Sequence, residues 1–236
     1  MIHVESLYKK FDRHEVLTGL DLHIHKGGIF AILGPNGSGK TTLIKTVLGM
    51  VIPNKGKISV MGSPIEDSWK YRKEINYLPQ IANFPGNLKV KELIDMIKDV
   101  RQKPSEEGKL IDRFGLGPFL DKKLTNLSGG TKQKVNIVLA FMFDSPLIIL
   151  DEPTNGLDPM ALILLKELIV EEKAKGKTFL ITSHIMQFVE EVSDEIVYLL
   201  EGKIYFKGNI PELMEKTGET NFERAIAAIS TQKNHG

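Results

Sequence analysis

The 236-residue chain contains no cysteine, which excludes disulfide bonds and thiolate metal sites and suits a reducing compartment. It has no excess of charge either, because 31 Lys and Arg residues against 30 Asp and Glu residues leave a net charge of +1. This balance gives no general attraction to nucleic acid or to an anionic membrane, so we expect no nucleic-acid partner. No stretch approaches the length of a membrane span, and the charged start lacks the apolar core of a signal peptide. We therefore expect a soluble chain that is large enough to bury a sizeable core.

A glycine-rich stretch stands out early in the chain, where residues 34–42 read GPNGSGKTT. The spacing fits a phosphate-binding loop, whose backbone N–H groups close around phosphate oxygens. Lys40 can reach the terminal phosphates, and Thr41 can offer a hydroxyl to magnesium. An apolar strand over residues 29–33 and a helix over residues 41–48 are expected on either side. The alternative is a plain turn between strand and helix, but the flanking pattern favours nucleotide binding.

Two further strands deliver polar residues that suit phosphate chemistry. Residues 147–150 predict a buried strand that ends in Asp151 and Glu152, and residues 178–183 predict another that ends at His184. One carboxylate can hold magnesium, and the other can deprotonate the attacking water. The histidine can contact a terminal phosphate and orient the water. The alternatives are that Asp151 and Glu152 simply form a solvated strand end and that His184 is an ordinary surface histidine.

Three other residues lie where a strand or a helix meets a loop. Gln80 follows a short strand over residues 74–78, at the end where α/β proteins place ligand contacts. Ser128 is expected to cap a helix over residues 131–143, and the two glycines after it can expose N–H groups to an anion. A simple loop and cap explains that turn equally well. Asp158 is expected to cap the next helix, which begins at Pro159.

The remaining pattern predicts the architecture around these residues. Residues 2–5 and 20–25 alternate as antiparallel strands beside a mostly parallel sheet do. His23 and His25 would share one face there, either as a metal pair or, as we favour, on a solvated strand face. Residues 81–143 have a helical pattern, in which Met96 and Val100 are placed on an apolar face. A hairpin over residues 195–207 closes the sheet, and residues 231–236 are expected to form a frayed tail.

Taken in order, these motifs resemble the nucleotide-binding subunits of ABC transporters over roughly residues 2–208. Residues 34–42 resemble the Walker A motif of that family, and residues 147–152 resemble its Walker B motif. Residues 127–131 resemble its signature, residues 156–158 its D-loop, Gln80 its Q-loop and His184 its switch histidine. The family also stacks an aromatic side chain on adenine, for which Phe11 is the best candidate and Tyr8 the second choice.

The resemblance implies an α/β fold in a single domain: a P-loop NTPase core with a mostly parallel sheet, an antiparallel β edge subdomain and an inserted helical signature subdomain. Residues 1–80 and 146–208 would form the core with its β edge, residues 81–145 the helical subdomain, and residues 209–236 a short C-terminal segment. The resemblance also implies a head-to-tail homodimer that holds two ATP molecules between Walker A of one subunit and the signature of the other.

Residue roles follow from the same resemblance. Glu152 would be the general base, and His184 and Gln80 would assist hydrolysis. Thr41, Gln80 and Asp151 would hold magnesium. Ser128, Gly129, Gly130 and Asp158 would contact the ATP of the partner subunit. The residues expected to contact ATP within the chain are Phe11, Gly34, Pro35, Asn36, Gly37, Ser38, Gly39, Lys40, Thr41 and Thr42.

The chain departs from the family pattern at three points. Thr131 stands where the signature usually ends in glutamine, and Leu139 replaces a common arginine. Lys89 replaces a threonine cap, although Glu92 keeps the capping-box position. These changes leave Ser128 in place, so they put the geometry of partner contact in more doubt than hydrolysis.

The leading hypothesis is an ATPase subunit, peripheral on the cytoplasmic face of the cell membrane, that drives a separate integral membrane subunit of an exporter. A copper-processing system for nitrous oxide reductase maturation is one alternative, because the stretch from Ser128 to His184 is similar to its ATPase. A soluble ABC ATPase that acts on nucleic acid or ribosomes is another. Ile81, Phe84 and Leu88 would offer apolar surface to the membrane subunit, unless they pack the core of the chain itself.

Overall fold

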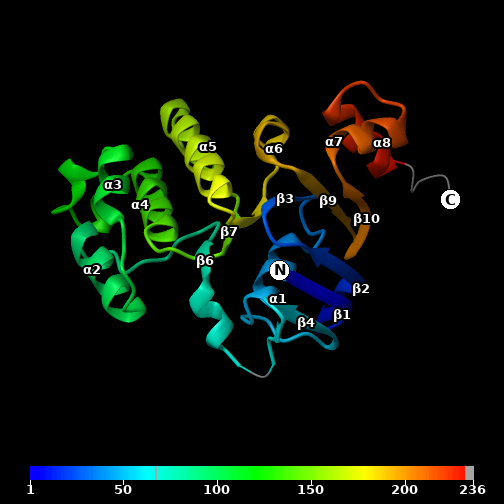
Figure 1. The fold of residues 1–236 in the computed structure, drawn as a ribbon, viewed down its shortest axis with the longest axis horizontal. Coiled ribbons are helices and arrows are strands. Elements are labelled where there is room, and N and C mark those ends of the chain that lie inside the picture. The colour runs from blue at the N-terminus through cyan, green and yellow to red at the C-terminus, as the bar shows by residue number, and fades with distance from the viewer. Residues whose placement is uncertain (67, 232–236) are drawn as a thin grey trace.

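The computed structural model describes residues 1–66 and 68–231. Its main sheet has six strands in the order β10-β9-β3-β8-β7-β6 (Figure 1). All neighbours in this sheet are parallel except β9 and β10, which form the expected closing hairpin. The strands are β3 (Gly28–Leu33), β6 (Ile75–Leu78), β7 (Leu147–Asp151), β8 (Thr178–Thr182), β9 (Glu195–Leu200) and β10 (Lys203–Gly208). The prediction of a mostly parallel sheet is confirmed.

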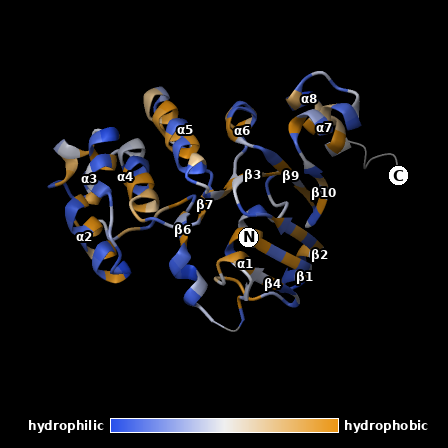
Figure 2. Ribbon diagram, in the orientation of Figure 1, coloured by the Kyte–Doolittle hydropathy of each residue, from blue (hydrophilic) through white to orange (hydrophobic). Residues whose placement is uncertain are grey.

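The antiparallel strands form a second sheet of their own, in the order β2-β1-β4-β5. They are β1 (Ile2–Phe11), β2 (His14–Ile24), β4 (Lys55–Val60) and β5 (Ser63–Pro64). Hydrophobic and hydrophilic residues alternate along the inner parts of β1 and β2 (Figure 2). Both strands extend beyond the predicted segments and meet at the pair Phe11 and His14. The alternation fails in that outer part, where register shifts interrupt the pairing, so the sequence pattern showed only the inner half.

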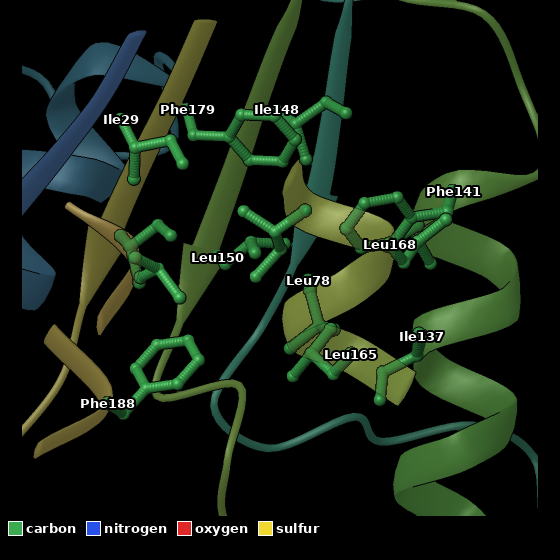
Figure 3. Packing of buried hydrophobic residues seen from close by; sticks show 14 of the residues in the cluster. Ile29, Leu78, Ile137, Phe141, Ile148, Leu150, Leu165, Leu168, Phe179 and Phe188 are labelled. Atoms are coloured by element: carbon green, nitrogen blue, oxygen red, sulfur yellow. The ribbon is translucent and has the colours of Figure 1, made fainter. Parts of the chain in front are cut away.

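Both faces of the main sheet are buried, as is usual for parallel strands. In β3, Ile29 and Leu33 belong to one hydrophobic cluster, whereas Phe30 and Ile32 belong to the other. The first cluster lies against α4 (Gly129–Phe141) and α5 (Pro159–Ala174), as Figure 3 shows. The second includes residues of α1 (Lys40–Val47) and of the antiparallel sheet. The main sheet therefore lies between two layers.

The helices α2 (Val90–Arg101) and α3 (Glu107–Arg113) gather with α4 at one end of the molecule, away from the antiparallel sheet (Figure 1). Their positions follow the helical pattern of residues 81–143. The backbone N–H of Lys89 donates to Glu92 Oε2 over 2.8 Å at the start of α2. Contrary to the predicted apolar face, Met96 and Val100 are exposed, Val100 by 77%. Helical spacing places residues on one side of a helix, but it does not say how far a neighbour covers that side.

The apolar residues after Gln80 have different environments. Phe84 and Leu88 are partly buried and pack against the main hydrophobic cluster. Ile81 is 72% exposed. The alternative prediction, packing within the chain, therefore holds for Phe84 and Leu88, and only Ile81 is left as exposed apolar surface.

The last helices are α6 (Met186–Val192), α7 (Ile210–Thr217) and α8 (Phe222–Thr231). Beyond Thr231, the tail predicted over residues 231–236 falls outside the described residues. Among the helices that the structure describes, none has the length and apolar character needed to cross a membrane.

Candidate active site

A cavity of about 320 Å³ lies where several strands of the main sheet end at their carboxyl edge. It is lined by the loop between β3 and α1, by the residues after β6 and β7, and by the outer part of the β1–β2 hairpin. The lining residues are Phe11, His14, Val16, Asn36, Gly37, Gly39, Lys40, Thr41, Thr42, Gln80, Asp151 and Glu152. One cavity thus brings together the predicted phosphate loop, the acidic pair, Gln80 and the aromatic residue.

The path of the phosphate loop requires glycine at two positions. Gly34 has φ +149°, and a Cβ there would lie 2.0 Å from the carbonyl oxygen of Leu199 in β9. Gly39 has φ +106°, and its Cβ would lie 2.9 Å from the carbonyl oxygen of Val16 in β2. A larger residue would push the loop away from both sheets. The conformation of the loop therefore depends on contacts with β9 and β2, which are not its neighbours in the sequence.

Lys40 places a positive charge inside this loop. Its Nζ donates to the carbonyl oxygens of Gly34 at 2.7 Å and of Pro35 at 3.0 Å. Burial lowers the pKa of Lys40, while the charges of Glu152 and Asp151 act in the opposite direction. A half-buried ammonium group beside the N-terminal end of a helix suits a polyphosphate.

Three residues predicted to contact ATP do not line the cavity. Gly34 and Pro35 serve instead as hydrogen-bond acceptors for Lys40. Ser38 is buried, and its Oγ has no hydrogen-bond partner. Conversely, the sequence analysis missed His14 and Val16, which line the cavity because the hairpin extends farther than the alternating pattern indicated.

The acidic pair is held by Thr182 on the neighbouring strand β8, which pairs with Asp151 in register. The hydroxyl of Thr182 donates to Asp151 Oδ1 over 2.5 Å and accepts from the backbone N–H of Glu152 over 3.0 Å. Glu152 has φ +51°, a left-handed conformation that is uncommon for a residue with a side chain. Successive side chains of a regular strand point to opposite faces, whereas this bend after the strand lets Asp151 and Glu152 line the same cavity. The sequence analysis did not single out Thr182.

His184 lies against Glu152 rather than within the cavity lining. Its Nδ1 lies 2.7 Å from Glu152 Oε2, and its backbone N–H donates to the same oxygen over 3.3 Å. The imidazole is 63% exposed, whereas the carboxylate is buried. The structure thus joins two predicted catalytic residues, and the histidine can orient the carboxylate. Its contact with phosphate stays a prediction.

The residues predicted to act on the partner's ATP lie outside the cavity. Ser128 Oγ accepts from the backbone N–H of Thr131 over 3.2 Å, which places the cap as expected, and the two hydroxyl groups lie 2.8 Å apart. The helix begins at Gly129, two residues earlier than predicted. Asp158 caps α5 by accepting from the N–H of Ala161, and its other oxygen pairs with Lys134 at 2.7 Å. Within one chain, these residues do not reach the nucleotide cavity.

The donor set of the cavity suits magnesium. Thr41, Gln80 and Asp151 offer oxygen ligands, which a hard divalent cation prefers. Within residues 1–66 and 68–231, no group of three or more His, Cys, Asp or Glu residues could hold a metal. A magnesium ion here would therefore share its coordination with phosphate oxygens and water, as is usual for this ion.

His23 in β2 and His25, just beyond the end of that strand, do not form a pair. His23 Nδ1 lies 3.2 Å from Nδ1 of His3 on β1. His25 Nε2 lies 3.0 Å from a carboxylate oxygen of Glu195 on β9. The favoured interpretation, a solvated strand face, agrees with these separate partners.

Residues 17–155 match the sequence profile of the ABC transporter family. The chain belongs to this family. It is 32% identical to the uncharacterized ABC transporter ATP-binding protein YhaQ of Bacillus subtilis, over 94% of this chain and 75% of that protein. It is also 32% identical to the Nod factor export ATP-binding protein I of Burkholderia pseudomallei, over 91% of this chain and 72% of that protein.

A solved structure of an ATP-binding subunit of an ABC transporter superposes with a TM-score of 0.91 at 30% identity, covering 98% of this chain and 99% of the other. The family relationship confirms the predicted P-loop fold and ATP binding. The chain is thus an ABC-type ATP-binding subunit with ATPase activity. Copper processing stays a prediction.

Proposed function

We propose that the chain is the ATP-hydrolysing subunit of an exporter and works as a head-to-tail dimer on the cytoplasmic face of a membrane. The export function is supported by the name of the Nod factor export relative. Pairing is supported by the exposed turn at Ser128 and Gly129, which lies outside the cavity of its own chain. In such a dimer, each turn with Gly130 and Asp158 would face the ATP held by the other subunit.

In this proposal the adenine stacks on Phe11, and the triphosphate lies along residues 34–42 with Lys40 at its terminal end. Glu152 accepts a proton from the water that attacks the terminal phosphorus, and ADP and phosphate leave. Thr41, Asp151 and Gln80 would hold magnesium, which when bound neutralises charge on the phosphate oxygens. The observation that carries the mechanism is the buried Glu152 carboxylate, which shares the cavity with Lys40 and is oriented by His184.

The test is Glu152→Gln, which keeps the shape of the side chain but removes a base. We expect ATP binding to persist while turnover falls by roughly 10² to 10⁴-fold, the range for a positioned base. The variant should also form a dimer that depends on ATP in gel filtration. Glu190→Gln, an exposed change on α6, is the matched control. Turnover near that of the wild type would reject the base, and a monomer at saturating ATP would reject the pairing.

We further propose that parts of the chain move relative to one another during the cycle. Residues 1–80 and 146–208 would act as the nucleotide-binding core, residues 81–145 as the helical subdomain, and residues 209–236 as a C-terminal segment. The loop after Gln80 joins the first two parts, so it would shift when the terminal phosphate leaves. Exposed Ile81 supports contact between this loop and an integral membrane subunit.

A further inference from the structure

Two buried amide side chains connect the signature helix α4 to the backbone beside the active site. Gln133 Nε2 donates to the carbonyl oxygen of Pro153 over 2.9 Å, and Asn136 Nδ2 donates to that of Pro79 over 3.2 Å. Asn136 is 2% exposed, and its Nδ2 lies 3.5 Å from Gln133 Oε1. The two residues are one helical turn apart, so they form one polar strip on a single face of α4.

The two accepting carbonyl groups flank residues of the proposed mechanism. Pro153 directly follows Glu152, and Pro79 directly precedes Gln80. Strands β6 and β7 pair in parallel and in register, so both prolines lie beyond the same edge of the sheet. Each carbonyl has left the strand ladder, and the amides of α4 supply its hydrogen bond.

The start of α4 has further close contacts with the chain after Glu152. A Cβ on Gly130 would lie 2.7 Å from the carbonyl oxygen of Gly156, so the two backbones touch. Lys134 pairs with Asp158 at 2.7 Å. The first two turns of the helix are thus tied to residues 153–158, while Asn136 makes the hydrogen bond to Pro79 O. A movement of α4 would therefore act on Gln80 through Asn136.

We propose that Asn136 is a positioning residue for Gln80, acting through the carbonyl of Pro79. Its short amide fixes the point at which the chain leaves β6, and so the direction in which Gln80 enters the cavity. Gln133 orients the amide of Asn136 and holds the chain after Glu152 in the same way. The proposal rests on the proposed role of Gln80 in hydrolysis.

The chain offers a matched control at the same junction. Asn76 in β6 is buried, and its Nδ2 donates to the carbonyl oxygen of Phe143, just beyond the end of α4, over 2.8 Å. Its Oδ1 also accepts from Ser145 Oγ over 2.9 Å and from Arg101 Nη2 over 3.4 Å, so its removal breaks more hydrogen bonds than the two of Asn136 described above. Asn76 lies inside β6, four residues before Gln80, whereas Pro79 directly precedes Gln80. A purely structural role predicts that Asn76→Ala harms activity at least as much as Asn136→Ala.

The experiment compares Asn136→Ala, Asn76→Ala, Gln80→Ala and the double Asn136→Ala/Gln80→Ala change in the full chain. Steady-state ATPase gives kcat and KM, calorimetry gives the ADP affinity, and thermal unfolding gives Tm. We expect Asn136→Ala to lower kcat by about 5 to 20-fold with ADP affinity within about twofold of wild type. Asn76→Ala should keep kcat within about twofold despite a lower Tm. The double variant should match Gln80→Ala, because residues that act as one unit are not additive.

Asn136→Leu fills the space of the lost side chain and so separates the effect of a cavity from the loss of the hydrogen bond. Its kcat should fall by as much as that of Asn136→Ala. The proposal is overturned if both asparagine variants lose kcat in proportion to Tm, or if the effects of Asn136→Ala and Gln80→Ala multiply in the double variant. If Gln80→Ala alone leaves kcat unchanged, the proposed role of Gln80 fails, and the inference fails with it. If Gln80→Ala is impaired but the effects multiply, only the inference fails.

Discussion

Two glycine-rich turns each begin a helix in this molecule, yet their surroundings differ. The phosphate loop before α1 is pressed against two sheets, so that Gly34 and Gly39 have no room for a Cβ. The signature turn is open at Gly129, where a Cβ would meet nothing within 4 Å, and only Gly130 lies against other backbone of the chain, at Gly156. The first turn is completed by its own chain, whereas the second leaves space for another molecule. One chain thus holds a finished nucleotide site and a surface that a partner can complete.

The largest effect that would sharpen this comparison comes from Ser128→Arg. The new side chain adds bulk and charge where the ATP of a partner would dock, while the cavity of the same chain is untouched. We expect ATP turnover to fall by about 10²-fold or more, with ADP affinity of the monomer within about twofold of wild type. Steady-state ATPase and calorimetry on the same preparation measure both quantities.

Lys40→Ala changes the nucleotide cavity itself rather than the signature turn, because the ammonium group of Lys40 lies in that cavity. It should weaken nucleotide binding by the monomer by about 10 to 100-fold, as loss of a charge-assisted hydrogen bond does. If Ser128→Arg weakens monomer binding as much as Lys40→Ala, the signature turn acts within its own chain and the comparison breaks.

An intermediate effect is expected at Ile81, the other exposed surface assigned to a partner. Ile81→Asp should lower recovery of the chain with membranes by about tenfold when a cognate membrane subunit is co-expressed, because it places a charge in an apolar contact. Basal ATPase of the isolated chain should stay within a few-fold of wild type. Val170→Asp, also at an exposed apolar residue but on α5, is the control. Equal recovery of both variants would contradict the contact.

The smallest effect concerns the salt bridge between α4 and the turn before α5. The hydrogen bond from Lys134 lowers the pKa of the Asp158 carboxyl group, with help from the N–H of Ala161. Such a group stabilises the fold above its unfolded pKa near 4, and this contribution is lost as pH falls through the lowered value. Lys134→Ala should raise the pKa of Asp158 toward its unfolded value, and the effect on stability should be small, since the Asp158 carboxylate is exposed. NMR titration measures the pKa, with exposed Lys132→Ala as the control; an unchanged pKa would contradict the pairing.

The sequence predicted the parts of the site that are local in the chain. The phosphate loop needs nine consecutive residues, and Asp151 and Glu152 follow a continuous apolar strand, so their patterns are visible without the fold. Thr182 was missed because its role depends on how β8 pairs with β7. The register of these two strands places Thr182 beside Asp151, although the residues are far apart in the sequence. Asn136 was missed for a similar reason, since nothing in the pattern of a helix says that a buried amide meets the carbonyl of Pro79.

Exposure was the other quantity that local patterns did not reveal. Met96 and Val100 have the spacing of an apolar face, but the neighbouring elements leave them uncovered. Phe84 looked like partner surface because it follows Gln80, and yet it packs on the core. Whether an apolar side chain is covered depends on tertiary neighbours, which a spacing pattern does not contain.

The contact between the phosphate loop and β9 has a consequence for how the protein is made. The loop leaves the ribosome early, but Leu199 and Gly202, which lie against it, come near the end of the chain. The N–H of Gly202 donates to the carbonyl oxygen of Ser38, and β3 pairs with both β8 and β9. During synthesis the segment around Lys40 must therefore wait, with its apolar strand unpaired, until the last strands emerge. The phosphate loop is thus translated in the first fifth of the chain but closed only by strands from its last fifth.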